Sequence, residues 1–84
     1  MADYTDLRIE PNAVNGGISA LFNVGEQQYY ADIADLPFCG VECMIFKSKD
    51  GQVIDWLEEY CRRGLLCNEH SLKECIEEFV SSLS

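Results

Sequence analysis

The chain has 84 residues, of which 48% are hydrophobic and 25% charged, and its 15 acidic side chains against 6 basic ones give a formal net charge of −9. A chain of this length and apolar content builds one small core, which excludes a disordered protein. Clustered Lys and Arg are needed to neutralise phosphates or anionic lipids, so the acidic balance excludes direct binding to nucleic acid or to a membrane surface.

The first ten residues carry Asp3, Asp6 and Glu10, where a signal peptide would need a basic start followed by an apolar stretch. No apolar run reaches the length that crosses a bilayer. We therefore expect a cytoplasmic protein that forms a single domain over residues 1–84.

Within residues 1–13, Leu7 and Ile9 alternate with polar side chains, which predicts a short edge strand or a flexible arm. Pro11 limits such a strand to an edge because it cannot donate a hydrogen bond to a neighbouring strand. The segment Asn15-Gly16-Gly17 then predicts a turn, since these residue types accept positive φ angles at low cost.

The sheet is predicted over residues 17–54. Hydrophobic side chains alternate with the others over residues 17–24, and the pattern returns over residues 28–33 after a turn at Gly25. Residues 41–47 form the most apolar run, and an Asp50-Gly51 turn separates them from a short return strand at residues 52–54. Three to four antiparallel strands in sequence order make a β-meander.

Two helices are predicted over residues 55–83. The first would start at a capping box, Asp55 to Glu58, and stop at Gly64. The second would start at a capping box, Ser71 to Glu74. Its apolar stripe has helical spacing: Leu72, Cys75, Ile76, Phe79, Val80 and Leu83. We thus expect an α+β fold, an antiparallel three- to four-stranded meander with two C-terminal helices packed on one face.

The five cysteines are predicted to be core thiols, because their odd number and the absence of a signal peptide argue against a disulfide framework. The alternative is a structural zinc site, since thiolates and an imidazole are zinc ligands; its ligands would be Cys39, Cys43, Cys67 and His70. Cys67 and His70 could also form a nucleophile and base, but no third orienting residue is identifiable. We expect no catalytic residue and no cofactor.

Adjacent residues of a strand face opposite sides of a sheet, so one of the neighbours Tyr29 and Tyr30 points away from the helices. Leu21, Tyr30 and Ile45 are predicted to form an apolar patch on the uncovered face. Such patches mark contact surfaces. The patch predicts self-association or binding of a protein partner.

The order of several short segments resembles a group of short uncharacterised bacterial proteins. The segments are Tyr29-Tyr30-Ala31-Asp32-Ile33 before Pro37-Phe38, Glu42-Cys43-Met44-Ile45-Phe46, Asp50-Gly51-Gln52-Val53-Ile54-Asp55-Trp56 and Tyr60-Cys61. The resemblance implies a bacterial or phage-borne origin, and it implies no activity and no functional residues.

The function predicted from these features is that of a small acidic interaction or accessory module without catalysis, with a protein partner or a second copy as its ligand. Small size favours this reading, because a standard interface of about 800 Å² per partner takes a large share of such a surface. The alternatives are a structural zinc module and an acidic nucleic-acid mimic that inhibits a basic protein.

Overall fold

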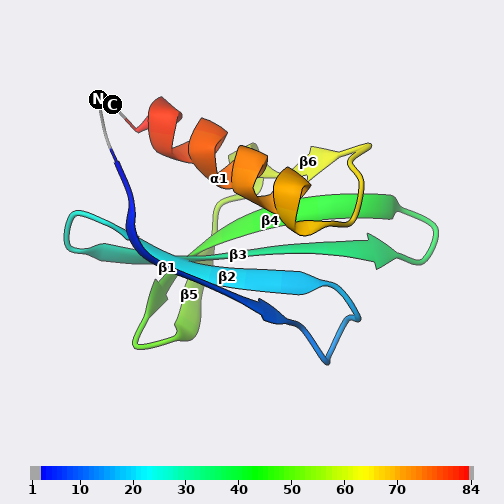
Figure 1. The fold of residues 1–84 in the computed structure, drawn as a ribbon, viewed down its shortest axis with the longest axis horizontal. Coiled ribbons are helices and arrows are strands. Elements are labelled where there is room, and N and C mark those ends of the chain that lie inside the picture. Colours follow the sequence, from blue (N-terminus) through cyan, green and yellow to red (C-terminus); the bar gives the residue numbers. More distant parts are fainter. Residues whose placement is uncertain (1–2, 84) are drawn as a thin grey trace.

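The computed structural model describes residues 3–83, and in this part of the chain one α-helix lies along one face of an antiparallel sheet (Figure 1). The elements in chain order are β1 (Thr5–Pro11), β2 (Ile18–Val24), β3 (Gln27–Leu36), β4 (Gly40–Lys49), β5 (Gln52–Trp56), the 3₁₀-helix η1 (Glu58–Tyr60), β6 (Arg62–Arg63) and α1 (Glu69–Ser82).

Strands β1 to β5 lie side by side in sequence order, each antiparallel to the next, and β6 pairs with the first residues of β4. The α+β class and the antiparallel meander are therefore confirmed. The expected three to four strands are too few, since the sheet has six, and the expected two helices are too many.

The β4–β5 turn illustrates how local sequence sets this topology. Asp50 and Gly51 both have positive φ angles, 54° and 81°. This backbone matches the right-handed twist of paired strands, which is why Asp-Gly favours a tight hairpin.

The core lies between α1 and one face of the sheet. The helix buries its predicted stripe there, apart from Leu83, which follows the last helical turn as the C-cap residue and is 40% exposed. Phe79 is the central contact, because its ring meets Tyr60 at 4.6 Å and Tyr29 at 4.9 Å between ring centroids, both edge to face. An ion pair between Arg62 of β6 and Glu78 of α1 joins the helix to the sheet edge at the surface.

The helix predicted from Asp55 is wrong. Trp56 instead ends β5 opposite Phe46, and the Leu57 amide donates to the Ile45 carbonyl at 2.9 Å. Only a three-residue 3₁₀ turn follows before β6. A helix of about nine residues is marginal by itself, whereas the edge of β4 offers hydrogen bonds at once. Gly64, predicted as a helix stop, follows β6 and has a φ of 76°.

The start of the second helix is also corrected. Asn68 is the N-cap residue, and its side-chain oxygen accepts a hydrogen bond from the Ser71 amide at 2.8 Å. Ser71 itself lies in the first turn and is buried. Asn, like Ser, is a preferred cap, and the Asn68 cap starts the helix three residues earlier than the capping box predicted.

No helix within residues 3–83 is both long enough and apolar enough to cross a membrane.

Candidate interaction surface

The sheet face opposite α1 carries a row of large apolar side chains. Residues paired across antiparallel strands share a face, and the register places Leu21 opposite Tyr30, Tyr30 opposite Phe46 and Phe46 opposite Trp56. The rings of Tyr30 and Phe46 lie 5.7 Å apart between centroids. Leu21, Tyr30 and Phe46 are half-buried, and Trp56 is 47% exposed. We call the face that bears this row the open face.

A second row crosses the open face beside the first. It contains Ser19 of β2, Asp32 of β3 and Met44 of β4, again paired by the strand register. Asp32 is only 8% exposed, and its Oδ1 atom has no hydrogen-bond partner in the part of the chain that the structure describes. Burial raises the pKa of this carboxyl from 3.8 to about 6. The open face therefore contains a buried carboxylate whose Oδ1 atom accepts no hydrogen bond from residues 3–83.

The Tyr30 hydroxyl belongs to the same neighbourhood. It accepts a hydrogen bond from Asn12 Nδ2 at 3.0 Å. Burial raises the pKa of Tyr30, and the charge of Asp32 adds to the rise, while hydrogen bonds with Ser19 and Asn12 oppose it. The Tyr30 hydroxyl is therefore close enough to Asp32 for the two groups to interact electrostatically.

A second carboxylate on this face, Glu42, is just as buried, with 6% exposure, but it has a partner. Arg63 of β6 lies opposite Glu42 in the sheet, and its Nε atom approaches Glu42 Oε1 at 2.7 Å. The angle is not that of a hydrogen bond, since Oε1 lacks a hydrogen-bond partner, so the contact is an ion pair.

Of the predicted patch, Leu21 and Tyr30 lie on the open face, whereas Ile45 does not. Ile45 is 1% exposed and belongs to the core under α1, because Ala31, its partner in β3, faces the helix. Apolar and polar side chains do not alternate regularly over residues 41–47, so the sequence does not indicate which of them face the core. Phe46, the next residue, takes the place expected for Ile45.

Trp56 was missed for a different reason, because its segment was read as a helix. The Asp50-Gly51 turn does not reveal it either, because regular pairing about that turn would set Asp55 opposite Phe46. A register shift between Lys47 and Ser48 sets Trp56 there instead.

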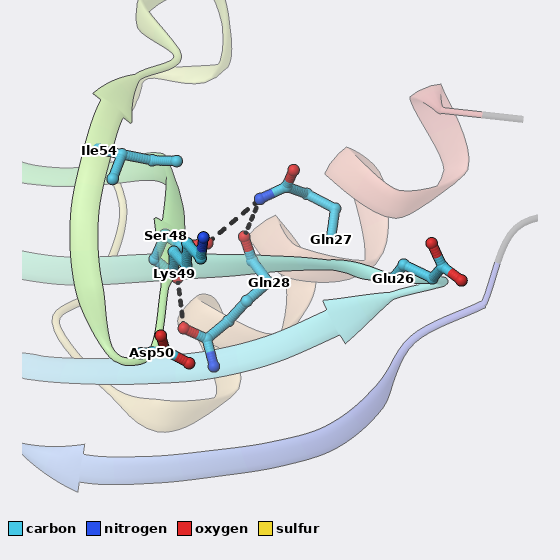
Figure 2. A pocket seen from close by; sticks show the side chains of 7 residues that line it. All are labelled: Glu26, Gln27, Gln28, Ser48, Lys49, Asp50 and Ile54. Carbon is cyan, nitrogen blue, oxygen red and sulfur yellow. Dashed lines mark hydrogen bonds between the residues drawn. The ribbon is translucent and has the colours of Figure 1, made fainter.

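A small polar pocket of about 360 Å³ lies between the β2–β3 and β4–β5 turns (Figure 2). Gln28 Oε1 accepts hydrogen bonds from Ser48 Oγ at 3.0 Å and from the Gly51 amide at 2.8 Å, while Gln27 Nε2 donates to the Ser48 carbonyl at 3.2 Å. Figure 2 shows the hydrogen bonds among Gln27, Gln28 and Ser48, which join the two hairpins. We therefore interpret the pocket as a structural feature of the two hairpins.

The five cysteines are free thiols that fall into different environments. Cys43 and Cys75 are buried between the sheet and α1, Cys61 is half-buried, and Cys39 and Cys67 are exposed. The hydrogen bond with Cys75 and burial both raise the pKa of the Cys43 thiol. Cys43 is therefore a neutral core thiol.

The four residues of the zinc alternative are not brought together. Within residues 3–83, no three His, Cys, Asp or Glu side chains form a group that could hold a metal ion. The Cys67 thiol contacts the Ile33 carbonyl at 3.7 Å, and His70 Nε2 lies 2.9 Å from Glu74 Oε1, one helical turn along α1. Cys67 and His70, the alternative nucleophile and base, thus each contact a different group and not each other.

Comparisons of the sequence and of the structure with known proteins find no family model, no curated protein and no solved structure that matches this chain. The open face is consequently the structural feature that indicates a function.

Proposed function

We propose that the chain is a small binding module that holds a basic protein partner on its open face. The observation that carries this proposal is the row of Leu21, Tyr30, Phe46 and Trp56, four large apolar side chains placed side by side by the strand register. Single apolar side chains are ordinary on a surface, whereas contiguous ones mark contact sites. Tyr, Trp and Phe are also the types enriched where binding energy concentrates.

The net charge of −9 supports a basic partner. Opposite net charges speed the encounter of two proteins, and like charges oppose it, so two copies of this chain repel each other as they approach. Part of this charge lies on the outward surface of α1, at Glu74, Glu77 and Glu78. Attraction would then be long-range, and the apolar row would supply the contact.

The size of the molecule is compatible with this role. Its accessible surface is 5372 Å², so a standard interface of about 800 Å² on this side would use roughly a seventh of it. One sheet face is sufficient for such an area, and no deep cleft is required.

The experiment compares two Phe→Lys variants in the same selection. Phe46→Lys places a charge in the apolar row, and Phe38→Lys makes the same change at a fully exposed turn residue between β3 and β4. Wild-type protein is used to select binders from a random peptide display library, and the binders are then measured on both variants. Circular dichroism verifies that both variants are folded.

We expect the selected peptides to be rich in apolar and basic residues, to bind Phe38→Lys like wild type, and to lose at least tenfold in affinity for Phe46→Lys. Equal binding to both variants, or a failure to select any peptide, would overturn the proposal. Light scattering adds one further outcome: a wild-type dimer that Phe46→Lys dissociates would make a second copy the occupant of the face in place of a basic partner.

A further inference from the structure

The buried carboxylate of Asp32 is the one feature of the open face that an apolar contact surface leaves unexplained. Its Oδ1 atom is enclosed and has no hydrogen-bond partner among residues 3–83, and the whole residue is 8% exposed. Native proteins leave few buried polar atoms unsatisfied, because each costs the solvation that it has lost. A buried charge without a partner is costlier still.

Asp32 is not part of the core. It alternates along β3 with Ala31 and Ile33, which face α1 and are fully buried, so its own side chain lies on the opposite side of the sheet. Its cross-strand neighbours on that side are Ser19 and Met44. The unpaired acid therefore faces the surface to which a partner would bind.

Glu42 shows how this face satisfies a buried acid when the chain itself supplies the counter-charge. Its ion pair with Arg63 keeps the carboxylate compensated, although Arg63 is itself 71% exposed. Asp32 lies diagonally across from Glu42, since Met44 and Ala34 are the respective partners of the two acids. The two acids thus share a face and a degree of burial and differ in their partner.

The side chains around Asp32 suit a long cationic side chain. Tyr30 precedes Asp32 on the same face of β3, and its ring contacts Phe46. Met44 lies directly opposite Asp32 in β4, on that same face. Aromatic rings attract ammonium and guanidinium groups, and rings and thioethers pack well against the methylene stem of Lys or Arg.

We propose that Asp32 is a subsite for a lysine or arginine side chain of the bound protein, which pairs with the Asp32 carboxylate while its stem packs against Tyr30 and Met44. This inference rests on the proposed function, since it names the chemistry that the open face recognises. The ion pair that Arg63 forms with Glu42 within the chain is then formed at Asp32 by the partner.

The alternative source of the cation is a second copy of this chain. Arg8 lies on the open face opposite Leu21 and is exposed, so a face-to-face dimer could present it to Asp32. The repulsion between two chains of charge −9 argues for a separate basic partner. The test distinguishes the two sources by the effect of Arg8→Gln.

The test begins with two small probes of the same shape, n-butylguanidinium and the neutral n-butylurea. Each is titrated into the full chain while backbone and carboxyl resonances are followed by NMR. We expect butylguanidinium to shift the signals of Asp32, Tyr30 and Met44 and to lower the titration midpoint of Asp32, whereas butylurea at the same concentration leaves the midpoint unchanged. Asp32→Asn should remove the response.

The control is Glu10→Gln, which removes an equal charge from an exposed position of the same face, on β1 opposite Ser19. It should retain the butylguanidinium response and, with the selected peptides, an affinity within about twofold of wild type. Asp32→Asn should lose roughly tenfold in peptide affinity, which is the scale of one charge-assisted hydrogen bond. Peptides reselected on Asp32→Asn should no longer be enriched in Lys and Arg.

Three results would overturn the inference. Peptides that need Phe46 but bind Asp32→Asn as well as wild type would remove the cation subsite and leave the proposed function standing. A wild-type dimer that both Arg8→Gln and Asp32→Asn dissociate would assign the cation to a second copy. If the peptides are indifferent to Phe46 as well as to Asp32, the proposed function fails together with the inference.

Discussion

The rings of Tyr30 and Phe46 lie with their centroids 5.7 Å apart and their planes at 52°, on the face of the sheet that α1 does not cover. One residue along each strand, Ala31 opposes Ile45 on the face that the helix does cover. Consecutive residues of β3 and β4 thus belong to two different surfaces, the core and the open face. This difference makes matched pairs of substitutions informative.

Ile45 and Phe46 form the first such pair. We expect Ile45→Ala to lower the free energy of unfolding by about 2–4 kcal/mol, because it leaves a cavity in the core, and Phe46→Ala to lower it by about 1 kcal/mol or less. Urea unfolding followed by circular dichroism measures both. A larger loss for Phe46→Ala than for Ile45→Ala would show that the open face is part of the stabilising core.

Asp32→Asn should stabilise the free protein at neutral pH. Burial raises the pKa of Asp32 to about 6 from 3.8, so between these pH values the folded state binds more protons than the unfolded one. The destabilisation by the charged carboxylate is therefore absent below about pH 4 and fully present above about pH 6.

We expect Asp32→Asn to exceed wild type by roughly 1–2 kcal/mol at pH 7.5 and the two to converge as the pH falls to 4. Urea unfolding over this pH range measures the difference, with Glu10→Gln as the charge-matched control. A difference that stays constant with pH would contradict the buried, unpaired state of Asp32. Increased stability together with weaker cation binding is a combination that a purely structural acid would not produce.

Phe79→Ala should be among the most destabilising substitutions in the chain. The Phe79 ring joins α1 to Tyr29, Tyr60 and Phe22, with centroids 4.9, 4.6 and 6.2 Å away. Its removal should cost about 3–5 kcal/mol and lower the thermal midpoint substantially. Phe38→Ala, at a fully exposed ring, should leave the midpoint nearly unchanged, and equal effects of the two would contradict the assigned core.

The start of α1 can be tested at its cap. Asn68→Ala removes the side-chain oxygen that accepts from the Ser71 amide and should cost about 1 kcal/mol, while Asn68→Ser should recover most of the loss. Ser71→Ala should cost less than Asn68→Ala if Asn68 is the cap. The reverse order in thermal unfolding would restore the capping box predicted from the sequence.

Gly17→Ala tests a close approach of the turn before β2 to strand β3. A Cβ atom at Gly17 would lie 2.0 Å from the Ile33 carbonyl oxygen, a backbone atom that cannot move aside without shifting β3. We expect a loss of about 2 kcal/mol or more, typical of overpacking. Gly25→Ala is the control, because nothing lies within 4 Å of its Cβ position and only its φ of 61° opposes the change.

Most of the strands and the long helix follow from local patterns. The alternation around Ala20 and Phe22 predicts β2, the stripe from Leu72 to Val80 predicts α1, and Asp50-Gly51 predicts the hairpin between β4 and β5. Each of these signals is contained within a few residues and needs no distant partner. The α+β class and the order of the meander could accordingly be predicted.

The segment after Ile54 could not be predicted in this way. Its capping box and short amphipathic pattern favour a helix locally, but pairing with the edge of β4 supplies backbone hydrogen bonds that a short helix cannot match. The competing partner lies several residues earlier in the chain, so no local rule reveals the outcome.

The sequence by itself therefore determined the acidic charge, the strand order, the long helix and the presence of Leu21 and Tyr30 on one face. Only the tertiary structure decided that Phe46 and Trp56 complete their row and that Ile45 is core. It also decided that Asp32 is buried without a partner among residues 3–83, while Glu42 pairs with Arg63. The physical reason is that charge and periodicity are properties of the chain as written. Burial and pairing of a side chain depend on which strands become its neighbours when the sheet forms.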